Sequence, residues 1–394
     1  MTSNLSPRLQ IQPDWQATVS ERQIGSKIWL NILYPASSGK ENIFGSLKYD
    51  ATKQLIKDGL PESLEIANVG IKTLSLKFEG HTFKFVAPSS AYSSLSNNKI
   101  YSLDISPLGQ LGVIGCADGR ARIWDVASGS VRRELSGHLS DVTCSRFLPS
   151  GKVVMTGGAD FLIKIWDLSN GECASTLKGH RGAINSIDFI NRGRNFISSS
   201  RDSSCKLWDC ASQSEITTLY KGSSSITWCA VASNTSLSTL NSPALDEKDF
   251  DTEGKIGALV SSSGLLRIFD IRTRQPIWSQ TMPYGLNCCT FVEDGYVVLA
   301  GSDDGHILDL DLRKTNQQPQ VKHPARSPIL SLSNCGKWFS TVDGGCFLNS
   351  EEGNSIELTG PDNDAVLKVI SSSEGKKIFT VSKDKTVRQY NILN

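Results

Sequence analysis

The sequence predicts an all-β fold in which four-stranded sheets form a closed ring, a β-propeller. Three observations predict it. Residues 137–209 contain markers that recur after 42 residues. Anchor residues of the type that proteins bury continue at comparable intervals toward the end of the chain. Upstream of the repeats, residues 73–87 alternate apolar and polar side chains as a β-hairpin does, so this segment can supply a strand that closes the ring.

The markers identify the type of repeat. They are Gly137-His138 and Gly179-His180, then Asp160 and Asp202, then Trp166-Asp167 and Trp208-Asp209. A period of about 40–45 residues with Gly-His early and Trp-Asp late is the signature of a WD40 repeat, a four-stranded blade that cannot bury its faces alone. Several blades must therefore stand side by side.

The repeated polar residues predict a hydrogen-bonded chain in each of these two blades. An indole N–H is a donor only, a carboxylate is an acceptor only, and imidazole and hydroxyl groups serve as either. A buried network of this kind pins loops to strands. The predicted structural tetrads are His138, Thr156, Asp160 and Trp166, and then His180, Ser198, Asp202 and Trp208. Although each set contains the residue types of a hydrolase triad, it recurs in both blades with a Trp attached, so we expect no catalytic residues and no enzyme.

The third-strand anchor position can be followed through the rest of the chain. The anchors are Trp124, Trp166, Trp208, Phe269, Leu310, Asn349 and Tyr390, at intervals of 42, 42, 61, 41, 39 and 41 residues. Six residues before each anchor stand the turn residues Asp118, Asp160, Asp202, Ser263, Asp304, Asp343 and Asp384. This series predicts a seven-bladed WD40 β-propeller. The long interval is explained by a surface insertion at residues 233–254 in blade four.

The remaining segments complete the predicted domain organisation. Residues 1–69 show no repeat marker and form a small N-terminal appendage, while residues 70–394 form the propeller, with a closing hairpin in residues 70–95 and blades from residue 96 on. The chain ends soon after the Tyr390 strand, so the last blade lacks one strand. Because a bare strand edge invites mispairing, we expect the hairpin at residues 73–87 to donate that strand.

Composition narrows the classes of partner. The 394 residues include 41 basic and 40 acidic side chains, a formal net charge of +1, which gives no electrostatic reason to expect nucleic acid or an anionic membrane as partner. We therefore expect a protein partner and a chain that is monomeric on its own. The first residues, MTSNLSPRLQ, lack the apolar core of a signal peptide, which favours a cytoplasmic and also a nuclear location.

The ten cysteines predict neither a metal site nor a cofactor. They occur singly or as the neighbouring pair Cys288-Cys289, with no C-x-x-C motif. No His stands at the spacing that zinc ligands need. We interpret the thiols as free and mostly buried.

Two charged segments leave alternatives open. The turn Arg192-Gly193-Arg194 is either a solvated hairpin turn, with Gly193 at positive φ, or a contact for a phosphate or a partner. The acidic run at residues 246–253 is either a solvated loop or a docking strip for a basic partner.

Propellers usually bind through the face that carries the loops entering each blade and the turns before each third strand, which we call the loop face. The repeat register places on it the charged candidates Asp141, Arg181, Arg201, Asp303, Asp362, Asp364 and Lys383. Trp228 stands near this face, where neighbouring blades have Cys144 and Ser186. A large aromatic residue there is either an anchor for a ligand or filler under the blade-four loop.

Longer strings resemble one family of WD40 proteins. KGHRGAINSIDFINRGRNFISSSRDSSCKLWDC (178–210), LQIQPDW (9–15), LNCCTF (286–291) and GGCFLNSEEGNSIELTG (344–360) resemble the proteasomal ATPase-associated factor family. The resemblance covers nearly the whole chain. The Arg-Gly-Arg turn and the paired cysteines distinguish it, because neither belongs to the generic repeat.

The resemblance implies a function that the residue pattern alone does not give. It implies an assembly chaperone of the proteasome regulatory particle, which binds the C-terminal domain of one ATPase subunit of the base and regulates 26S assembly. The alternative is a WD40 substrate adaptor or scaffold of a ubiquitin ligase or another complex. A phosphodegron reader concentrates Arg on the loop face, where this sequence offers Arg181, Arg201 and also Arg326 against several acids.

Overall fold

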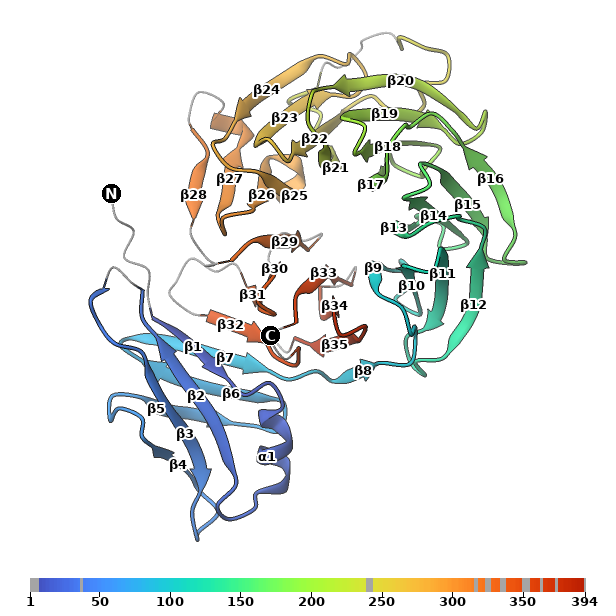
Figure 1. Ribbon diagram of the computed structural model, residues 1–394. Coiled ribbons are helices and arrows are strands. Elements are labelled where there is room, and N and C mark those ends of the chain that lie inside the picture. Colours follow the sequence, from blue (N-terminus) through green and yellow to red (C-terminus); the bar gives the residue numbers. More distant parts are fainter. Residues whose placement is uncertain are drawn as a thin grey trace.

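A ring of β-sheets and a smaller N-terminal module beside it make up the protein (Figure 1). The computed structural model describes residues 7–35, 38–238, 244–314, 318–322, 327–333, 338–348, 355–361, 364–372 and 375–392. In each sheet of the ring the first strand faces the central axis and the later strands lie progressively farther out, as Figure 1 shows for β13 to β16.

The ring consists of antiparallel sheets formed by consecutive strands. The first three sheets are β9 (Ile100–Ile105), β10 (Leu111–Cys116), β11 (Arg120–Asp125) and β12 (Val131–Ser136); β13 (Val142–Phe147), β14 (Val153–Gly158), β15 (Ile163–Asp167) and β16 (Cys173–Leu177); and β17 (Ile184–Phe189), β18 (Asn195–Ser200), β19 (Ser204–Asp209) and β20 (Ser214–Lys221). The next two are β21 (Ile226–Ser233), β22 (Lys255–Ser261), β23 (Leu265–Asp270) and β24 (Pro276–Thr281); and β25 (Leu286–Val292), β26 (Val297–Ser302), β27 (Ile307–Asp311) and β28 (Gln320–Lys322).

Two further sheets complete the ring with help from the N-terminal region. One contains β29 (Ile329–Leu332), β30 (Trp338–Thr341), β31 (Cys346–Leu348) and β32 (Ser355–Leu358), and the other contains β33 (Val366–Ser371), β34 (Lys377–Ser382), β35 (Val387–Asn391) and β8 (Ser90–Tyr92). The fold class is therefore the predicted all-β propeller, whereas the number of seven blades stays a prediction of the anchor spacing.

The anchors lie where the repeat spacing predicts them. Trp124, Trp166, Trp208, Phe269, Leu310 and Tyr390 are all buried between neighbouring sheets, and Asn349 lies outside the described residues. The second strands are buried on both faces, as β18 is at every position, because each sheet is covered by a neighbour on either side. The chain between Ser233, the last residue of β21, and Lys255, the first residue of β22, corresponds to the predicted insertion.

The N-terminal module has its own apolar core. Its elements are β1 (Arg8–Ile11), α1 (Trp15–Glu21), β2 (Lys27–Leu33), β3 (Ile43–Tyr49), β4 (Leu55–Asp58), β5 (Glu65–Val69), β6 (Thr73–Phe78) and β7 (His81–Val86). Strands β1 to β4 form one sheet, and β5 to β7 form part of another. Buried residues from Leu9 to Ala87 share one hydrophobic cluster. The module thus extends past the predicted boundary at residues 69 and 70, because the hairpin β6–β7 contributes to its core.

The strand that closes the ring corrects the prediction for the hairpin at residues 73–87. Strand β8 pairs antiparallel with β35, with Tyr92 opposite Val387, so the donor follows the hairpin instead of being part of it. The hairpin, which turns at Glu79 and Gly80 with positive φ at both, pairs elsewhere: β7 lies parallel to β32. Its apolar side chains are used by the N-terminal core, and Pro88, which lacks an amide hydrogen, ends β7 and releases the chain toward β8.

Side chains reinforce the joint between module and ring. The Trp15 indole donates to the Thr359 hydroxyl over 2.9 Å in a buried contact. Arg8 forms an ion pair with Asp343 at 3.0 Å and lies 4.7 Å from the centre of the Phe347 ring. Burial raises the pKa of the neighbouring Glu357 to about 7. Segments from the strings 9–15 and 344–360, which carry the family resemblance, therefore contact each other at this joint.

Candidate protein-binding face

The first tetrad ties two loops of the loop face to the sheet β13–β16. Both ring nitrogens of His138 are used: Nδ1 lies 2.9 Å from the Asp160 carboxylate and Nε2 lies 2.8 Å from the Thr156 hydroxyl. The Trp166 indole donates to the same hydroxyl over 2.8 Å. The loop before β13 is thereby fixed to the turn between β14 and β15.

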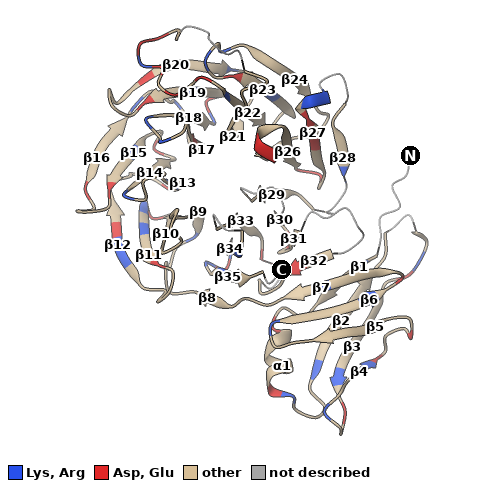
Figure 2. Ribbon diagram, turned by 180° about the vertical axis from the view of Figure 1, so that it is seen from behind, with Lys and Arg blue, Asp and Glu red and all other residues tan. Residues whose placement is uncertain are grey.

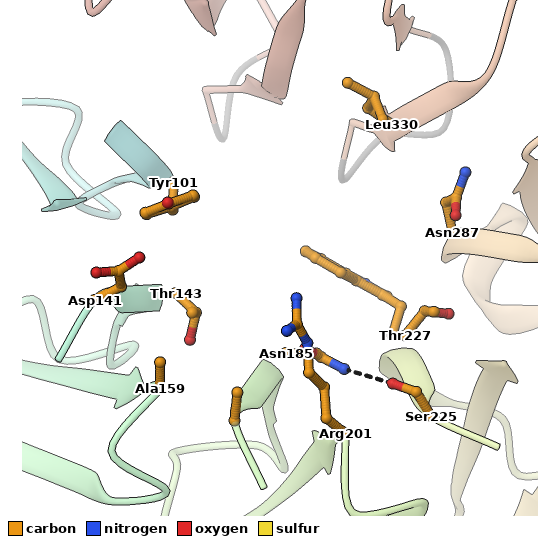
Figure 3. A pocket seen from close by; sticks show the side chains of 12 residues that line it. Tyr101, Asp141, Thr143, Ala159, Asn185, Arg201, Ser225, Thr227, Asn287 and Leu330 are labelled. Atoms are coloured by element: carbon orange, nitrogen blue, oxygen red, sulfur yellow. Dashed lines mark hydrogen bonds between the residues drawn. The ribbon is translucent and has the colours of Figure 1, made fainter. Parts of the chain in front are cut away.

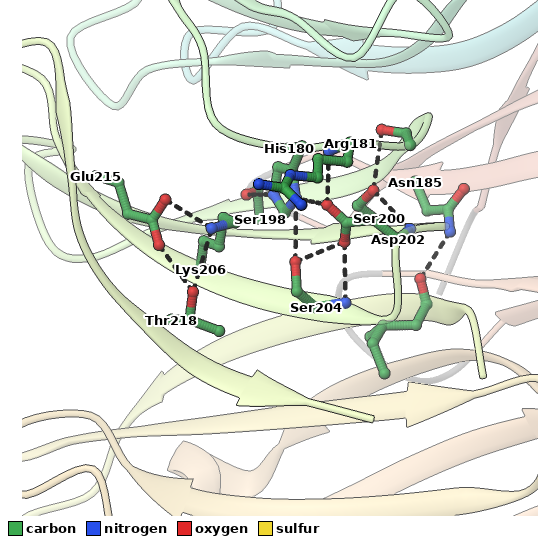
Figure 4. Close-up of polar contacts among 12 residues, drawn as sticks. His180, Arg181, Asn185, Ser198, Ser200, Asp202, Ser204, Lys206, Glu215 and Thr218 are labelled. Carbon is green, nitrogen blue, oxygen red and sulfur yellow. Dashed lines mark hydrogen bonds and ion pairs between the residues drawn. The ribbon is translucent and has the colours of Figure 1, made fainter. Parts of the chain in front are cut away.

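The second tetrad repeats this geometry in the sheet β17–β20, and Figure 4 shows three of its members, His180, Ser198 and Asp202. His180 lies 2.8 Å from Asp202 and 2.7 Å from the Ser198 hydroxyl, and the Trp208 indole donates to Ser198 over 2.8 Å. Ser204 adds a hydroxyl that donates to Asp202. All eight predicted tetrad residues thus come together in two networks of four.

The hydrogen-bond partners fix which atom of each tetrad carries the proton. An indole donates to the hydroxyl, so the hydroxyl donates to Nε2, and the imidazole must then donate from Nδ1 to the carboxylate. Burial lowers the pKa of His138 and His180, which favours this neutral form. Burial acts in the opposite direction on Asp202, but hydrogen bonds from Ser204, the Arg181 amide and His180 lower its pKa to about 2. Because the Thr156 and Ser198 hydroxyls are buried and doubly bonded, these networks fit a structural role.

Two other sheets replace the imidazole with a guanidinium. Arg122 pairs with Asp118 at 2.6 Å, and Arg388 pairs with Asp384, each four residues after the acid. The same strand position holds Lys164 and Lys206 in the tetrad sheets. The turn acid is therefore paired with a histidine in two sheets and with an arginine in two others.

A second device links successive sheets around the axis. The second residue of an inner strand donates to the first carbonyl of the next inner strand, from Asn185 to Ile226 over 2.6 Å and from Asn287 to Ile329 over 3.0 Å. Thr143 and Thr227 bond in the same way to Ile184 and Leu286. The corresponding residues of β29, β33 and β9 are Leu330, Leu367 and Tyr101, and a leucine has no donor. We call these bonds latches.

The axis opens on the loop face into a hollow of about 470 Å³ (Figure 3). Three predicted partner-binding residues, Asp141, Arg201 and Trp228, line it. The other described candidates are placed on the loops and turns around it, namely Arg181, Asp303, Asp364 and Lys383. Asp362 and Arg326 lie outside the described residues. Only part of the predicted set is thus brought to one place.

Trp228 reaches a partner that neither sequence-based interpretation named. The Lys368 ammonium nitrogen lies 3.5 Å from the centre of its ring. Lys368 belongs to β33, so this contact spans the axis between two non-neighbouring sheets. Burial, reinforced by the nearby Arg146 cation, lowers the pKa of Lys368 to about 8. A desolvated cation over an indole face is a favourable pair.

The insertion and the Arg-Gly-Arg turn interact with each other. The Arg194 guanidinium carbon lies 3.1 Å from the centre of the Phe250 ring, and Gly193 has φ +85°. Within the acidic run, Asp249 is buried and pairs with Arg274 at 3.1 Å. The part of this run around Asp249 and Phe250 is therefore packed against the ring and is not a freely solvated strip.

Two exposed apolar residues on the loop face were missed by sequence reasoning. Leu139 and Phe161 are 90% and 45% exposed. Leu139 follows the tetrad His138, and Phe161 follows the tetrad Asp160. Comparing repeats would have found Phe161, because the residue after the turn acid is Gly in several other blades, for example Gly119 and Gly305.

Three further observations concern the charge distribution, metal ligands and helix length. Figure 2 shows basic and acidic residues interspersed over the ring and the module. Among the described residues, no three His, Cys, Asp or Glu side chains are grouped so that they could hold a metal ion. Within the same described part of the chain, no helix has both the length and the apolar character needed to cross a membrane.

Comparison with similar proteins identifies the family to which this chain belongs. The family model described as "WD domain, G-beta repeat" matches residues 88–125, 129–167 and 171–209. A protein named Proteasomal ATPase-associated factor 1 from Gallus gallus is 44% identical over 400 residues, covering 98% of this chain and 99% of the relative. The chain belongs to the proteasomal ATPase-associated factor family.

Other members show the same full-length correspondence. The Homo sapiens protein of this family is 43% identical over 396 residues, with 98% of each chain covered. The Dictyostelium discoideum protein named Probable proteasomal ATPase-associated factor 1 is 35% identical over 428 residues, covering 100% of this chain and 99% of the relative. The similarity to proteasomal ATPase-associated factors thus includes the N-terminal module and its joint with the ring.

Proposed function

We propose that this protein is a non-catalytic assembly chaperone that binds the C-terminal domain of an ATPase subunit of the proteasome regulatory-particle base. The observation that carries the proposal is similarity over nearly the full length to proteins named as proteasomal ATPase-associated factors. The loop face supports it, because the tetrads hold its loops in fixed positions. Such a face binds with little loss of conformational freedom.

The mechanism we propose is occlusion. A ring bound to the free ATPase subunit covers a surface that other assembly partners later need, so it orders base assembly and regulates formation of the 26S proteasome. Mixed charges around the loop face steer the encounter and fix the register more than they increase affinity. We propose that the protein acts as a monomer in the cytoplasm and nucleus, with no nucleic acid or membrane as partner.

A binding experiment tests this function. The purified chain is titrated with the separate C-terminal domain of each base ATPase subunit by calorimetry. We expect one domain to bind, and the double variant Arg181→Glu/Arg201→Glu to weaken that binding by about tenfold or more. Arg192→Glu is the matched control, because it reverses an exposed charge in the β17–β18 turn, away from the loop face. Failure of every domain to bind would overturn the proposal.

A ubiquitin-ligase adaptor is the second candidate. Arg181 and Arg201 are both exposed, so their guanidinium groups are accessible to a phosphate. An array of phosphorylated peptides with unphosphorylated counterparts distinguishes the two functions. Phosphate-dependent capture together with no ATPase binding favours the adaptor.

A further inference from the structure

The turn between the second and third strands has a backbone requirement that glycine meets. The residue after the turn acid, or after Ser263, has positive φ in every sheet of the ring for which the structure describes it. Four of these residues are glycines and three are not: Gly119, Gly264, Gly305 and Gly344, and Phe161, Ser203 and Lys385. The turn therefore forms without a side chain at this position.

Phe161 meets this requirement at a conformational cost. Its φ is +70°, a region in which a bulky L-residue is strained. The residue is 45% exposed on the loop face, so much of its apolar surface remains in contact with water. Strained residues that persist at exposed positions concentrate at binding sites.

Leu139 lies on the adjoining loop. Its backbone amide donates to the Asp160 carboxylate over 3.0 Å, and the same carboxylate accepts from His138. The tetrad consequently fixes the loop that carries Leu139 to the turn that carries Phe161. We refer to these two residues as the apolar pair.

The neighbouring sheet presents different chemistry on the same scaffold. The Arg181 amide donates to Asp202 over 2.8 Å, as Leu139 does to Asp160, and Ser203 takes the place of Phe161 with φ +68°. Arg201 precedes that turn acid. Two exposed arginines thus stand on the sheet next to the one that carries the apolar pair.

We infer that the apolar pair is the anchor of the loop face, and that it receives an apolar side chain of the bound ATPase subunit that stands beside a carboxylate. The apolar side chain covers Leu139 and Phe161, and the carboxylate meets Arg181 or Arg201. This inference rests on the proposed function and specifies the surface that the partner must present. It also explains why a strained phenylalanine stands at a turn position where glycine is sufficient for the fold.

The test separates strain from binding. Phe161→Gly removes the strained side chain, so we expect the melting temperature to rise by about 1–2 °C while the Kd for the ATPase domain that the wild-type chain binds increases by about tenfold. Ser203→Gly is the matched control: it relieves the same backbone position in the next sheet and should leave the Kd unchanged. Leu139→Ser should weaken binding without a gain in stability, whereas Leu108→Ser, at an exposed leucine in the β9–β10 turn, should leave binding unchanged.

Each outcome decides a separate question. If the wild-type chain binds an ATPase domain and both Phe161→Gly and Leu139→Ser bind as tightly, the inference is overturned while the proposed function stands. If the wild-type chain binds no domain, both are overturned. If Arg181→Glu/Arg201→Glu retains full affinity while the apolar variants lose it, the carboxylate part of the inference is overturned.

Discussion

Neighbouring sheets are joined by different interactions in two parts of the ring. The latched arc comprises the sheets β13–β16, β17–β20, β21–β24 and β25–β28, and the seam arc comprises β29–β32, β33–β35 with β8, and β9–β12. In the latched arc, side chains at a repeated position bond each sheet to the next. In the seam arc, strands from the N-terminal region supply the pairing, with β7 on β32 and β8 on β35. The first arc thus uses a repeated bond, whereas the second also uses pairing between segments far apart in sequence.

The strands themselves reflect this difference. Among the residues that the structure describes, β31 and β32 pair at Phe347 and Glu357. Strand β7 pairs with all four residues of β32. Tyr92 of β8 also donates to the Val126 carbonyl over 2.7 Å, which joins the last sheet to the first. The sheet β29–β32 is thus also paired with a strand from outside its own repeat.

The largest expected effect comes from removing this pairing. Deleting residues 1–88 removes the N-terminal module but keeps β8, and we expect the melting temperature to fall by roughly 5–10 °C because the β32 edge is exposed. Deleting residues 1–92 also removes β8, and we expect the cooperative transition to disappear. Thermal unfolding followed by circular dichroism measures both. Identical behaviour of the two truncations would contradict the assignment of β8 as the closing strand.

A matched pair of hydroxyl deletions sharpens the comparison. Thr156 and Thr380 are the fourth residues of β14 and β34 and are both buried. Thr156→Val leaves the His138 Nε2 and the Trp166 indole without a partner, so we expect a loss of about 2–4 kcal/mol in the free energy of unfolding. The Thr380 hydroxyl has no hydrogen bond within the described structure, so Thr380→Val should change stability by less than about 1 kcal/mol. Urea denaturation of the two variants measures the difference, and equal losses would show that the tetrad adds nothing.

Acid should weaken the latched arc through its two histidines. Burial lowers the pKa of His138 and His180, so the folded chain keeps them neutral where the unfolded chain, with a His pKa of about 6.5, takes up protons. The free energy of unfolding therefore falls as pH decreases below about 6.5, by at most about 1.4 kcal/mol per pH unit for each His. The urea midpoint of the wild type should drop more between pH 7.5 and 5.5 than that of His138→Gln/His180→Gln. Parallel pH profiles would argue against the neutral tautomers.

The smallest effect is expected for one latch. Asn185→Leu gives β17 the residue type that β29 has at Leu330, and it removes the bond to the Ile226 carbonyl. We expect a loss of about 1 kcal/mol, the usual net contribution of one hydrogen bond. The urea midpoint again provides the measurement. No loss at all would mean that neighbouring sheets are held by apolar packing without help from the latches.

The parts of the fold that repeat could be predicted, and the parts that occur once could not. The tetrads and the anchors from Trp124 to Leu310 follow from spacing, because each copy confirms the others. The alternation in residues 73–87 suits any sheet edge, so the sequence alone favours this hairpin as the closing strand. The position of the hairpin is decided by contacts between segments far apart in sequence, such as that of Thr359 with Val86, 273 residues away.

The same distinction applies to the loop face. Asp141, Arg201 and Trp228 could be placed near the axis from the register, but the contact of Trp228 with Lys368 could not, since it joins two sheets that are not neighbours. Phe161 was overlooked because a phenylalanine reads as a core residue. Phe161 lies in a turn where its φ is positive. Comparing the same turn position in other sheets indicates this, whereas the hydrophobicity of the residue does not.

The joint at Trp15 also sets an order of events during synthesis. The ribosome releases Trp15 and Ser89 long before their partners Thr359 and Gln389, which follow 344 and 300 residues later. Throughout that interval β7 and β8 emerge as open edges, and an open edge pairs readily with foreign strands. The nascent polypeptide consequently reaches its final topology only when its last two sheets leave the exit tunnel, so these strand edges stay unpaired during most of translation.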